Sequence, residues 1–389
     1  MGYGKFSADR IFDGKRFLAS DQVVVMGPGG TIADILPGQD AGDDVKHLEG
    51  TLLPGLVNAH CHLELSHLKD VIPPHTGLIE FLVSVVQKRG FSREVVMDAI
   101  DRAEKEMADN GIVAVGDIGN TADTVERKSR SAIRWQNFVE VLSFTDERTP
   151  ENIRGYQKVL DRFNSTLDPK RHRSVLVPHA PYSISPLAFR MINEATAGQV
   201  ISIHNQEHPA EDDLYRSGGG EYLKLFRIFG IERSPFPVTG ISSIRSYLPH
   251  FDKGQTIFLV HDTFMPEEDL DWALEHARQH GLELVFCTCI NANLYIENKV
   301  PPLKRFLERG CHVVMGTDSY SSNWQLSIGS EIASVRRHFP DIPEETVLGW
   351  ATLQGAKALR WDDELGSLEK GKRPGLALLD KEYRSTRVA

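Results

Sequence analysis

The chain has 389 residues, enough for one large domain with an appendage or for two ordinary domains. Its 41% hydrophobic and 25% charged residues are typical of a globular protein. The net charge of −10 gives no electrostatic reason to expect a nucleic acid or a membrane as partner. Without a signal-like or membrane-spanning apolar run, the expected location is cytoplasmic, with the four cysteines as free thiols.

Both ends of the chain show short strand patterns separated by Gly- and Pro-containing turns. Near the N-terminus the expected strands cover 8–12, 23–26 and 32–36, and near the C-terminus an apolar run covers 376–379. Neither end is long enough to bury a core alone. We therefore predict one small β-sandwich domain made from residues 1–53 plus 362–389.

Between the two ends, short apolar runs alternate with longer amphipathic segments, a rhythm typical of repeated βα units. The expected strands are 53–59, 113–118, 137–142, 174–178, 200–204, 256–261, 283–287 and 312–317. The expected helices include 78–89, 93–110, 186–197, 267–280, 302–309 and 328–338. Eight such strands predict an α/β fold, a (β/α)8 TIM barrel over residues 54–361, with a lid-like insertion at 208–255.

Polar residues stand where several of these expected strands end. The first strand runs into His60-Cys-His62, which places two imidazoles on one face of the chain. Imidazole and carboxylate groups are common ligands of divalent metals. Because the carboxyl ends of barrel strands meet at one mouth, we expect the later strand-end residues to converge there as well. They are His179, His204, His261 and Asp318.

These motifs together resemble the amidohydrolase superfamily. The resemblance is closest to its mononuclear aminohydrolase branch, which includes adenosylhomocysteine, aminofutalosine and guanine deaminases and triazine hydrolases. It covers nearly the whole chain. The segments that carry it are 54–63, 179–183, 204–207, His261, 293–295, 316–319 and 365–372.

The resemblance implies a site with one divalent ion held by His60, His62, His204 and Asp318. Zinc suits three imidazoles and a carboxylate best, with iron and manganese left open. His261 would orient a metal-bound hydroxide, and Asp318 would first receive its proton. Glu207 would carry a proton to a ring nitrogen and to the departing amine. His179 would hydrogen-bond the substrate.

Two departures from the family pattern bear on the site. The seventh strand is followed by Cys289-Ile-Asn-Ala-Asn293 where the family often has Cys-Pro-x-Ser-Asn, so Asn293 is kept but the pocket floor differs. No Lys ends the fourth strand, where a carbamylated side chain would bridge a second ion, so we expect a one-metal site. Near the C-terminus, Pro374-Gly375 replaces the usual Ala-Asp without an expected catalytic consequence.

Substrate contacts are expected from the segment after the metal motif and from the insertion. In aminofutalosine and adenosine-type deaminases a carboxylate from this segment grips ribose hydroxyls, which points to Glu80 or Glu64. Arg148 could meet an anionic tail or be a surface residue. Aromatic residues of the insertion could stack on a purine or pack the core of the lid. They are Tyr215, Tyr222 and Phe226.

The function predicted from these features is hydrolytic deamination of an aminopurine nucleoside or related N-heterocycle. The expected small-molecule substrates are of the 6-aminodeoxyfutalosine, adenosine, methylthioadenosine or adenosylhomocysteine type. One alternative is removal of halide or alkylamine from an s-triazine, or opening of a cyclic amide. Another alternative is a catalytically silent barrel scaffold. A homodimer is left open as the assembly.

Overall fold

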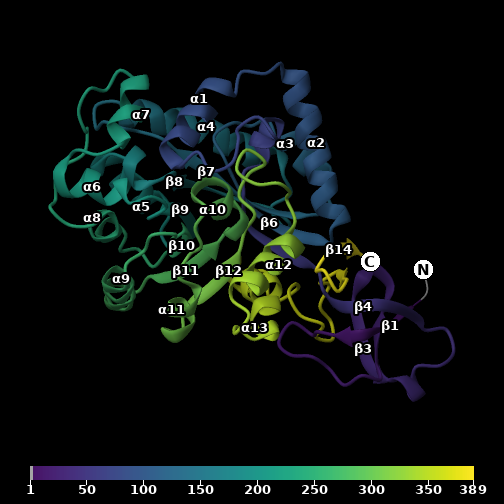
Figure 1. Cartoon of the computed structure of the whole chain (residues 1–389). Helices are drawn as coiled ribbons and strands as arrows, with labels where there is room; N and C mark the ends of the chain where they lie inside the picture. Colours follow the sequence, from purple (N-terminus) through teal and green to yellow (C-terminus); the bar gives the residue numbers. More distant parts are fainter. Residues whose placement is uncertain (1–2) are drawn as a thin grey trace.

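The computed structural model describes residues 3–389, so the first two residues of the predicted terminal domain lie outside the described part. Eight parallel strands form two four-stranded sheets, in the orders β5-β6-β7-β8 and β12-β11-β10-β9. Figure 1 shows these strands at the centre of the molecule with helices around them. The strands are β5 (Leu56–Cys61), β6 (Ile112–Gly119), β7 (Arg134–Val141), β8 (Arg173–Pro178), β9 (Val200–Asn205), β10 (Thr256–His261), β11 (Glu283–Thr288) and β12 (His312–Met315).

Backbone hydrogen bonds connect the two parallel sheets at both seams. Between β8 and β9, the His204 N–H donates to the His179 carbonyl at 3.0 Å. Between β5 and β12, the Thr317 N–H donates to the His60 carbonyl at 2.9 Å, beside a parallel bridge from Cys61 to Asp318. The strand ends of the two sheets therefore lie next to one another, and the residues at both seams include expected metal ligands.

The strands are nearly continuous apolar runs because helices cover them from outside. Every residue of β9 and β10 is buried, for example. The longer helices are α1 (Leu78–Lys88), α2 (Arg93–Asp109), α4 (Thr149–Thr166), α5 (Pro186–Ala195), α9 (Glu267–His280) and α12 (Ile328–His338). The shorter ones are α3 (Val125–Arg130), α6 (Ala210–Ser217), α7 (Tyr222–Ile228), α8 (Ser243–Tyr247), α10 (Ile290–Glu297), α11 (Leu303–Glu308), α13 (Glu344–Gly349) and α14 (Gly355–Ala358).

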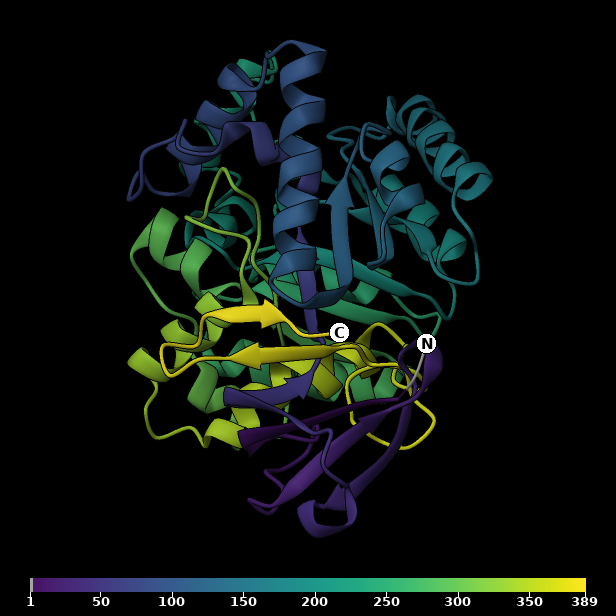
Figure 2. The same cartoon turned by 90° about the vertical axis from the view of Figure 1, so that its right-hand side faces the viewer.

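Strands from both ends of the chain pair in a third sheet of six strands, ordered β14-β13-β4-β1-β2-β3. Figure 2 shows the C-terminal strands lying beside the N-terminal ones. The sheet is mixed, because β1 pairs with β4 in parallel while the other neighbouring strands pair antiparallel. The strands are β1 (Gly4–Ile11), β2 (Gln22–Met26), β3 (Ile32–Pro37), β4 (Lys46–Pro54), β13 (Leu376–Leu379) and β14 (Ser385–Arg387).

The expected strand 53–59 is in fact divided between two sheets. Leu53 and Pro54 end β4, and β5 begins at Leu56. At the break, the Gly55 N–H donates to the carbonyls of Pro374 and Gly375 at 3.2 Å. A Cβ at Gly55 would lie 2.3 Å from Val113 Cγ1, so only glycine fits this crossing. The sequence pattern did not indicate this break, because the apolar residues continue across it from β4 into β5.

The connection between β9 and β10 carries α6, α7 and α8. Its α7 packs against α1, and together they form a separate apolar cluster above the strand ends. None of the helices among residues 3–389 has both the length and the apolar character needed to cross a bilayer. All four cysteines are free thiols.

Candidate metal centre and active site

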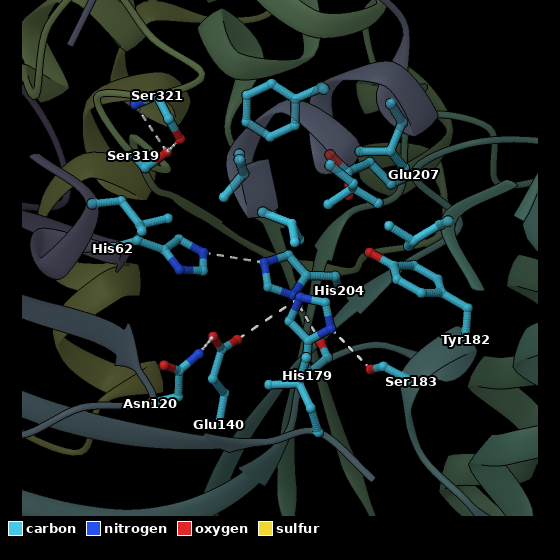
Figure 3. Close-up of a pocket in the computed structure, with 18 of the residues that line it drawn as sticks. His62, Asn120, Glu140, His179, Tyr182, Ser183, His204, Glu207, Ser319 and Ser321 are labelled. Atoms are coloured by element: carbon cyan, nitrogen blue, oxygen red, sulfur yellow. Dashed lines mark hydrogen bonds and ion pairs between the residues drawn. The ribbon is translucent and has the colours of Figure 1, made fainter. Parts of the chain in front are cut away.

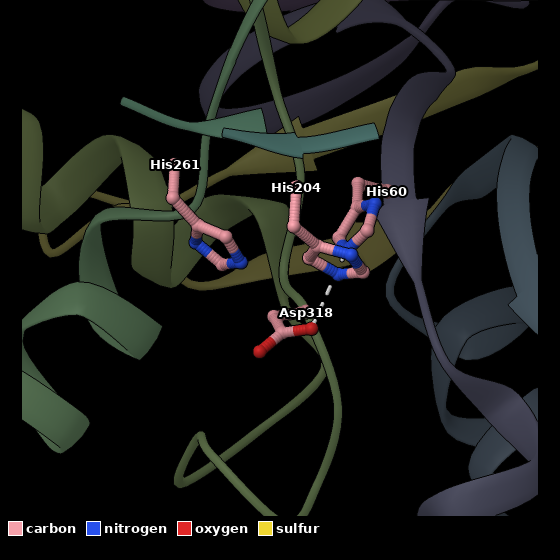
Figure 4. A group of neighbouring side chains, drawn as sticks. All are labelled: His60, His204, His261 and Asp318. Atoms are coloured by element: carbon pink, nitrogen blue, oxygen red, sulfur yellow. Dashed lines mark ion pairs between the residues drawn. The ribbon is translucent and has the colours of Figure 1, made fainter. Parts of the chain in front are cut away.

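Three imidazoles and one carboxyl group face one another at the ends of three strands. His60 and His62 come from the end of β5, His204 from β9, and Asp318 follows β12. The His62 Nε2 lies 3.2 Å from both His204 Nε2 and Asp318 Oδ1, and the His60 Nε2 lies 3.3 Å from Asp318 Oδ1. Ligand atoms of His60, His204, His261 and Asp318 all lie within 4.8 Å of one another (Figure 4).

The hydrogen bonds of His204 fix which of its nitrogens can bind a metal. Its Nδ1 lies 2.7 Å from the carbonyl oxygen of His179, and a carbonyl only accepts, so Nδ1 carries the proton. The Nε2 of His204 therefore presents a lone pair toward His62 and Asp318. An outer hydrogen bond that sets the tautomer in this way is the usual support of a metal-bound imidazole.

The charge balance of the cluster also fits a cation. Burial lowers the pKa of His60 to about 3, so this imidazole is neutral, and neither of its nitrogens has a hydrogen-bond partner among the described residues. Burial also acts to lower the pKa of His62, but the Asp318 carboxylate outweighs it and raises the pKa to about 9. A buried carboxylate facing several imidazoles thus favours positive charge at their centre. Three imidazoles and one carboxylate suit one divalent ion with a free coordination position.

The backbone around the ligands is held in uncommon conformations. His261 and Asp318 have φ values of 77° and 57°, in the left-handed region that side chains other than Gly, Asn and Asp rarely adopt. Two residues before Asp318, a Cβ at Gly316 would lie 2.7 Å from the His60 Cβ. Strained residues persist where the surrounding structure imposes them, and they concentrate at functional sites.

Glu207 and His261 form the second part of the centre. Glu207 follows β9, and its Oε1 lies 3.6 Å from the Nε2 of His261. Burial, reinforced by the charge of Asp318, holds the pKa of Glu207 well above its usual range. Burial lowers the pKa of His261, although the Asp318 carboxylate partly offsets this effect. A carboxyl group beside an imidazole can exchange protons with a bound molecule.

The cavity above the metal centre has a polar floor and apolar walls. We use the name floor for the lining residues His62, His179, His204, Glu207, His261 and Asp318, of which Figure 3 labels the first four. One face of α1 supplies much of the wall, because its cavity residues recur three and four positions apart. They are Leu78, Phe81, Leu82, Val85 and Val86. Phe144, Leu225 and Phe229 add to the apolar surface.

Three of the expected substrate contacts do not line this cavity. Glu80 points away from it and pairs with Lys224 on α7, where about half of each side chain is exposed. Arg148 is exposed and precedes α4. Asn293 is buried in α10, where its Nδ2 donates to the Thr263 hydroxyl.

Two other expected contacts do line the cavity. The Nδ1 of His179 is 2.9 Å from the Ser183 hydroxyl, and its ring faces the floor (Figure 3). Glu64 is buried, but both of its oxygens accept hydrogen bonds from the loop after β6. The Asn120 N–H donates to Glu64 at 3.2 Å and the Thr121 hydroxyl at 2.7 Å. Glu64 is thus engaged in holding this loop.

The aromatic residues of the insertion pack within its core. Tyr215, Tyr222 and Phe226 are each at most 4% exposed, and none of them lines the cavity. The ring of Tyr222 stacks on Tyr182 with centroids 4.2 Å apart. Of the two interpretations of these aromatics, packing of the lid core is the one that their contacts favour.

The polar cavity residues that sequence reasoning missed include Asn120, Glu140 and Arg89. Arg89 follows the last turn of α1, on the same face as the apolar wall. Glu140 lies within β7, in the run Asn137-Phe-Val-Glu140-Val. A charged residue inside an apolar strand is a signal that the sequence contained, because such residues are rarely buried without a role.

The fold and the metal-binding cluster define the chain as a metal-dependent hydrolase of the α/β class. Residues 51–388 match the amidohydrolase family, so the chain belongs to that family. It is thereby a hydrolase of carbon–nitrogen bonds other than peptide bonds.

Two sequence relatives and one solved structure illustrate the family members to which the chain is similar. A 5-methylthioadenosine/S-adenosylhomocysteine deaminase of Halalkalibacterium halodurans is 26% identical over 94% of this chain and 80% of its own length. An aminodeoxyfutalosine deaminase of Nitratiruptor is 26% identical over 86% of the chain and 80% of its own length. The crystal structure of Helicobacter pylori aminofutalosine deaminase in complex with methylthio-coformycin superimposes with a TM-score of 0.79 at 23% identity, covering 97% of this chain and 92% of that one.

Proposed function

We propose that the chain is a metal-dependent hydrolytic deaminase of an aminopurine nucleoside or related N-heterocycle. Its substrate would be of the 6-aminodeoxyfutalosine, adenosine, methylthioadenosine or adenosylhomocysteine type. The observation that carries the proposal is the buried Glu207 beside His261, directly next to the cluster of metal ligands. The deaminase names of the sequence relatives support the same reaction class.

Each residue of the centre has a role in this reaction. His60, His62, His204 and Asp318 would hold one ion, for which zinc suits the donor set best. When bound, the ion supplies Lewis acidity and lowers the pKa of water. Glu207 carries the proton that a ring nitrogen would receive, and the same carboxyl can later protonate the departing amine. His261 would orient the attacking water.

The proposal includes a fold that places these residues. We infer that the two parallel sheets make one (β/α)8 TIM barrel over residues 54–361, supported by the hydrogen bonds at both seams. The six-stranded sheet would be a small β-sandwich domain of residues 1–53 plus 362–389. The segment 208–255, which carries α6, α7 and α8, would be the lid over the cavity.

The test combines elemental analysis with ammonia release from adenosine, methylthioadenosine, adenosylhomocysteine and 6-aminodeoxyfutalosine. We expect one divalent ion per chain and ammonia from at least one of these compounds. Glu207→Gln should keep the ion but lose roughly 10²- to 10⁴-fold in kcat, because its amide cannot carry the proton. Glu221→Gln, an exposed acid of the same insertion, is the matched control. A metal-free chain that releases no ammonia would overturn the proposal.

A further inference from the structure

Glu140 presents a carboxyl oxygen without a partner to the active-site cavity. It lies one residue before the end of β7, is 6% exposed and lines the cavity (Figure 3). Its Oε1 accepts a hydrogen bond from the Asn120 Nδ2 at 2.8 Å. Its Oε2 has no hydrogen-bond partner among residues 3–389 and lies 3.9 Å from the Nε2 of His179. Buried carboxyl oxygens are normally paired, so Oε2 is expected to gain a partner when the cavity is filled.

The neighbouring groups hold Glu140 in this position. Asn120 donates its backbone N–H to Glu64 at 3.2 Å, so the side-chain amide that meets Glu140 comes from an anchored residue. Because Asn120 occupies only Oε1, the second oxygen is oriented but left free. An acceptor that is held in place before binding loses little conformational freedom when a donor binds. Such an acceptor favours ligands that carry the donor over ligands that lack it.

A second metal ion does not explain this arrangement. Glu140, His179 and His204 have ligand atoms within 4.8 Å of one another. However, the Nδ1 of His204 is committed to the His179 carbonyl, and its Nε2 faces His62 in the first site. Only one oxygen of Glu140 and one nitrogen of His179 are left, which is fewer than the three or four protein ligands of a typical site.

The other carboxyl groups near the cavity do not offer the same function. Both oxygens of Glu64 accept hydrogen bonds from Asn120 and Thr121. Glu80 lies outside the cavity and pairs with Lys224. The far walls are apolar, so a polar group of the substrate near the reacting end would meet Glu140 instead of these residues.

We propose that Glu140 is a specificity-determining residue whose Oε2 accepts a hydrogen bond from an N–H or O–H group of the substrate. Because Glu140 lies beside His179 and His204, the donor belongs to the heterocycle or to the first group attached to it. The substrate class is therefore an amino-heterocycle with a hydrogen-bond donor on that side. The inference rests on the proposed function, since it assumes that a heterocycle occupies this cavity.

The test replaces the hydrogen-bond acceptor at the position of Glu140 Oε2 by a hydrogen-bond donor. In Glu140→Gln, the amide oxygen can still accept from Asn120, which places the amide NH2 where Oε2 was. Affinity is measured by calorimetry on zinc-loaded protein that also carries Glu207→Gln, so that turnover does not interfere. Four ligand pairs differ by one donor group each: adenine and 9-methyladenine, 2,6-diaminopurine riboside and adenosine, adenosine and 2′-deoxyadenosine, and adenosine and 3′-deoxyadenosine.

We expect Glu140→Gln to weaken the donor-bearing member of one pair by roughly 10- to 100-fold, and its partner by less than about threefold. The pair that responds identifies the donor as a ring N–H, an amino group or a hydroxyl. Glu140→Asp keeps the carboxyl group but places it one methylene closer to the backbone. This variant should show a weaker loss in the same pair. Glu104→Gln is the control, because Glu104 is equally buried but does not line the cavity.

Equal losses for both members of every pair would overturn the inference, as would the absence of any loss or of any binding. A loss shared by Glu104→Gln and Glu140→Gln would also overturn it, since that outcome reflects folding alone. Ammonia release by the chain without substitutions is measured separately. Selective binding without ammonia would therefore contradict the proposed function while supporting the role of Glu140, and ammonia without selectivity would do the reverse.

Discussion

At the floor of the cavity, imidazole and carboxyl groups from five strand ends lie close together. On its walls, α1 and the insertion present mainly apolar side chains, and Glu80 of α1 is paired with Lys224 outside the cavity. The floor is built on the ends of largely buried strands such as β9, whereas the wall is formed mainly by α1 and by α7 of the insertion. Under the proposed function, the parallel strands would position the reacting groups together with Glu140, and the helices above them would supply apolar contact to the substrate.

The largest effect is expected from removing a ligand at the floor. His204→Ala should lower the bound metal from about one ion to well under one per chain, and kcat/KM by at least roughly 10³-fold, because the ion's contribution is lost with it. Elemental analysis and ammonia release measure the two quantities. His338→Ala, an exposed histidine at the end of α12, should leave both unchanged. Full metal content in His204→Ala would show that the floor is not the metal site.

A smaller effect concerns the stability of the insertion and its dependence on pH. Glu211 in α6 is buried, and burial raises its pKa to about 8. Its folded-state pKa is above the unfolded value near 4.5, so the folded protein keeps a proton that the unfolded chain loses. Stability from this group is therefore full below about pH 4.5 and declines as pH rises toward 8.

Glu211→Gln keeps the acceptor for Ser243 and Gln206 but cannot ionise. The free energy of unfolding of Glu211→Gln minus that of the unsubstituted protein should be larger at pH 8 than at pH 5 by a few kcal/mol. Chemical denaturation at both pH values measures this difference. A difference that is constant with pH would show that Glu211 is ionised in the folded protein.

Next in size is a change at the rim of the wall. Phe229 lines the cavity and is 44% exposed, so Phe229→Ala should cost little stability. We expect KM to rise by about 3- to 30-fold, with kcat within about twofold, because apolar contact is lost equally from the ground state and the transition state. Phe91→Ala removes a ring of similar exposure, 43%, from outside this cavity and should change neither constant. A fall in kcat alone would contradict the division between floor and wall.

The smallest effect is expected at the outer surface of α1. Glu80→Ala breaks an exposed pair with Lys224, which is worth about 0–1 kcal/mol. Thermal unfolding should shift by only a few degrees, and the relative rates on ribosides and free bases should not change. A selective loss on ribosides would instead show that Glu80 turns inward to bind the sugar.

The periodicity of the sequence located the strands well where burial is continuous. The expected strand 256–261 coincides with β10, and 200–204 differs from β9 by one residue. Such runs are recognisable because helices cover them on the outside and side chains fill the inside. The helix α4 was not among the expected helices, although Ile153, Tyr156, Leu160 and Phe163 recur at helical spacing and pack on the core. This helix was therefore a signal that the sequence contained and that was missed.

The sequence by itself determined the positions of the proposed reacting groups of this protein. His60, His62, His204, Asp318 and Glu207 stand at or just past strand ends, and parallel strands bring such positions to one edge whatever the details of packing. The tertiary structure alone decided which side chains face the substrate. Glu80 and Arg148 point away while Glu140 points in, because the direction of a side chain depends on how helices and loops pack, and no spacing in the sequence encodes that packing.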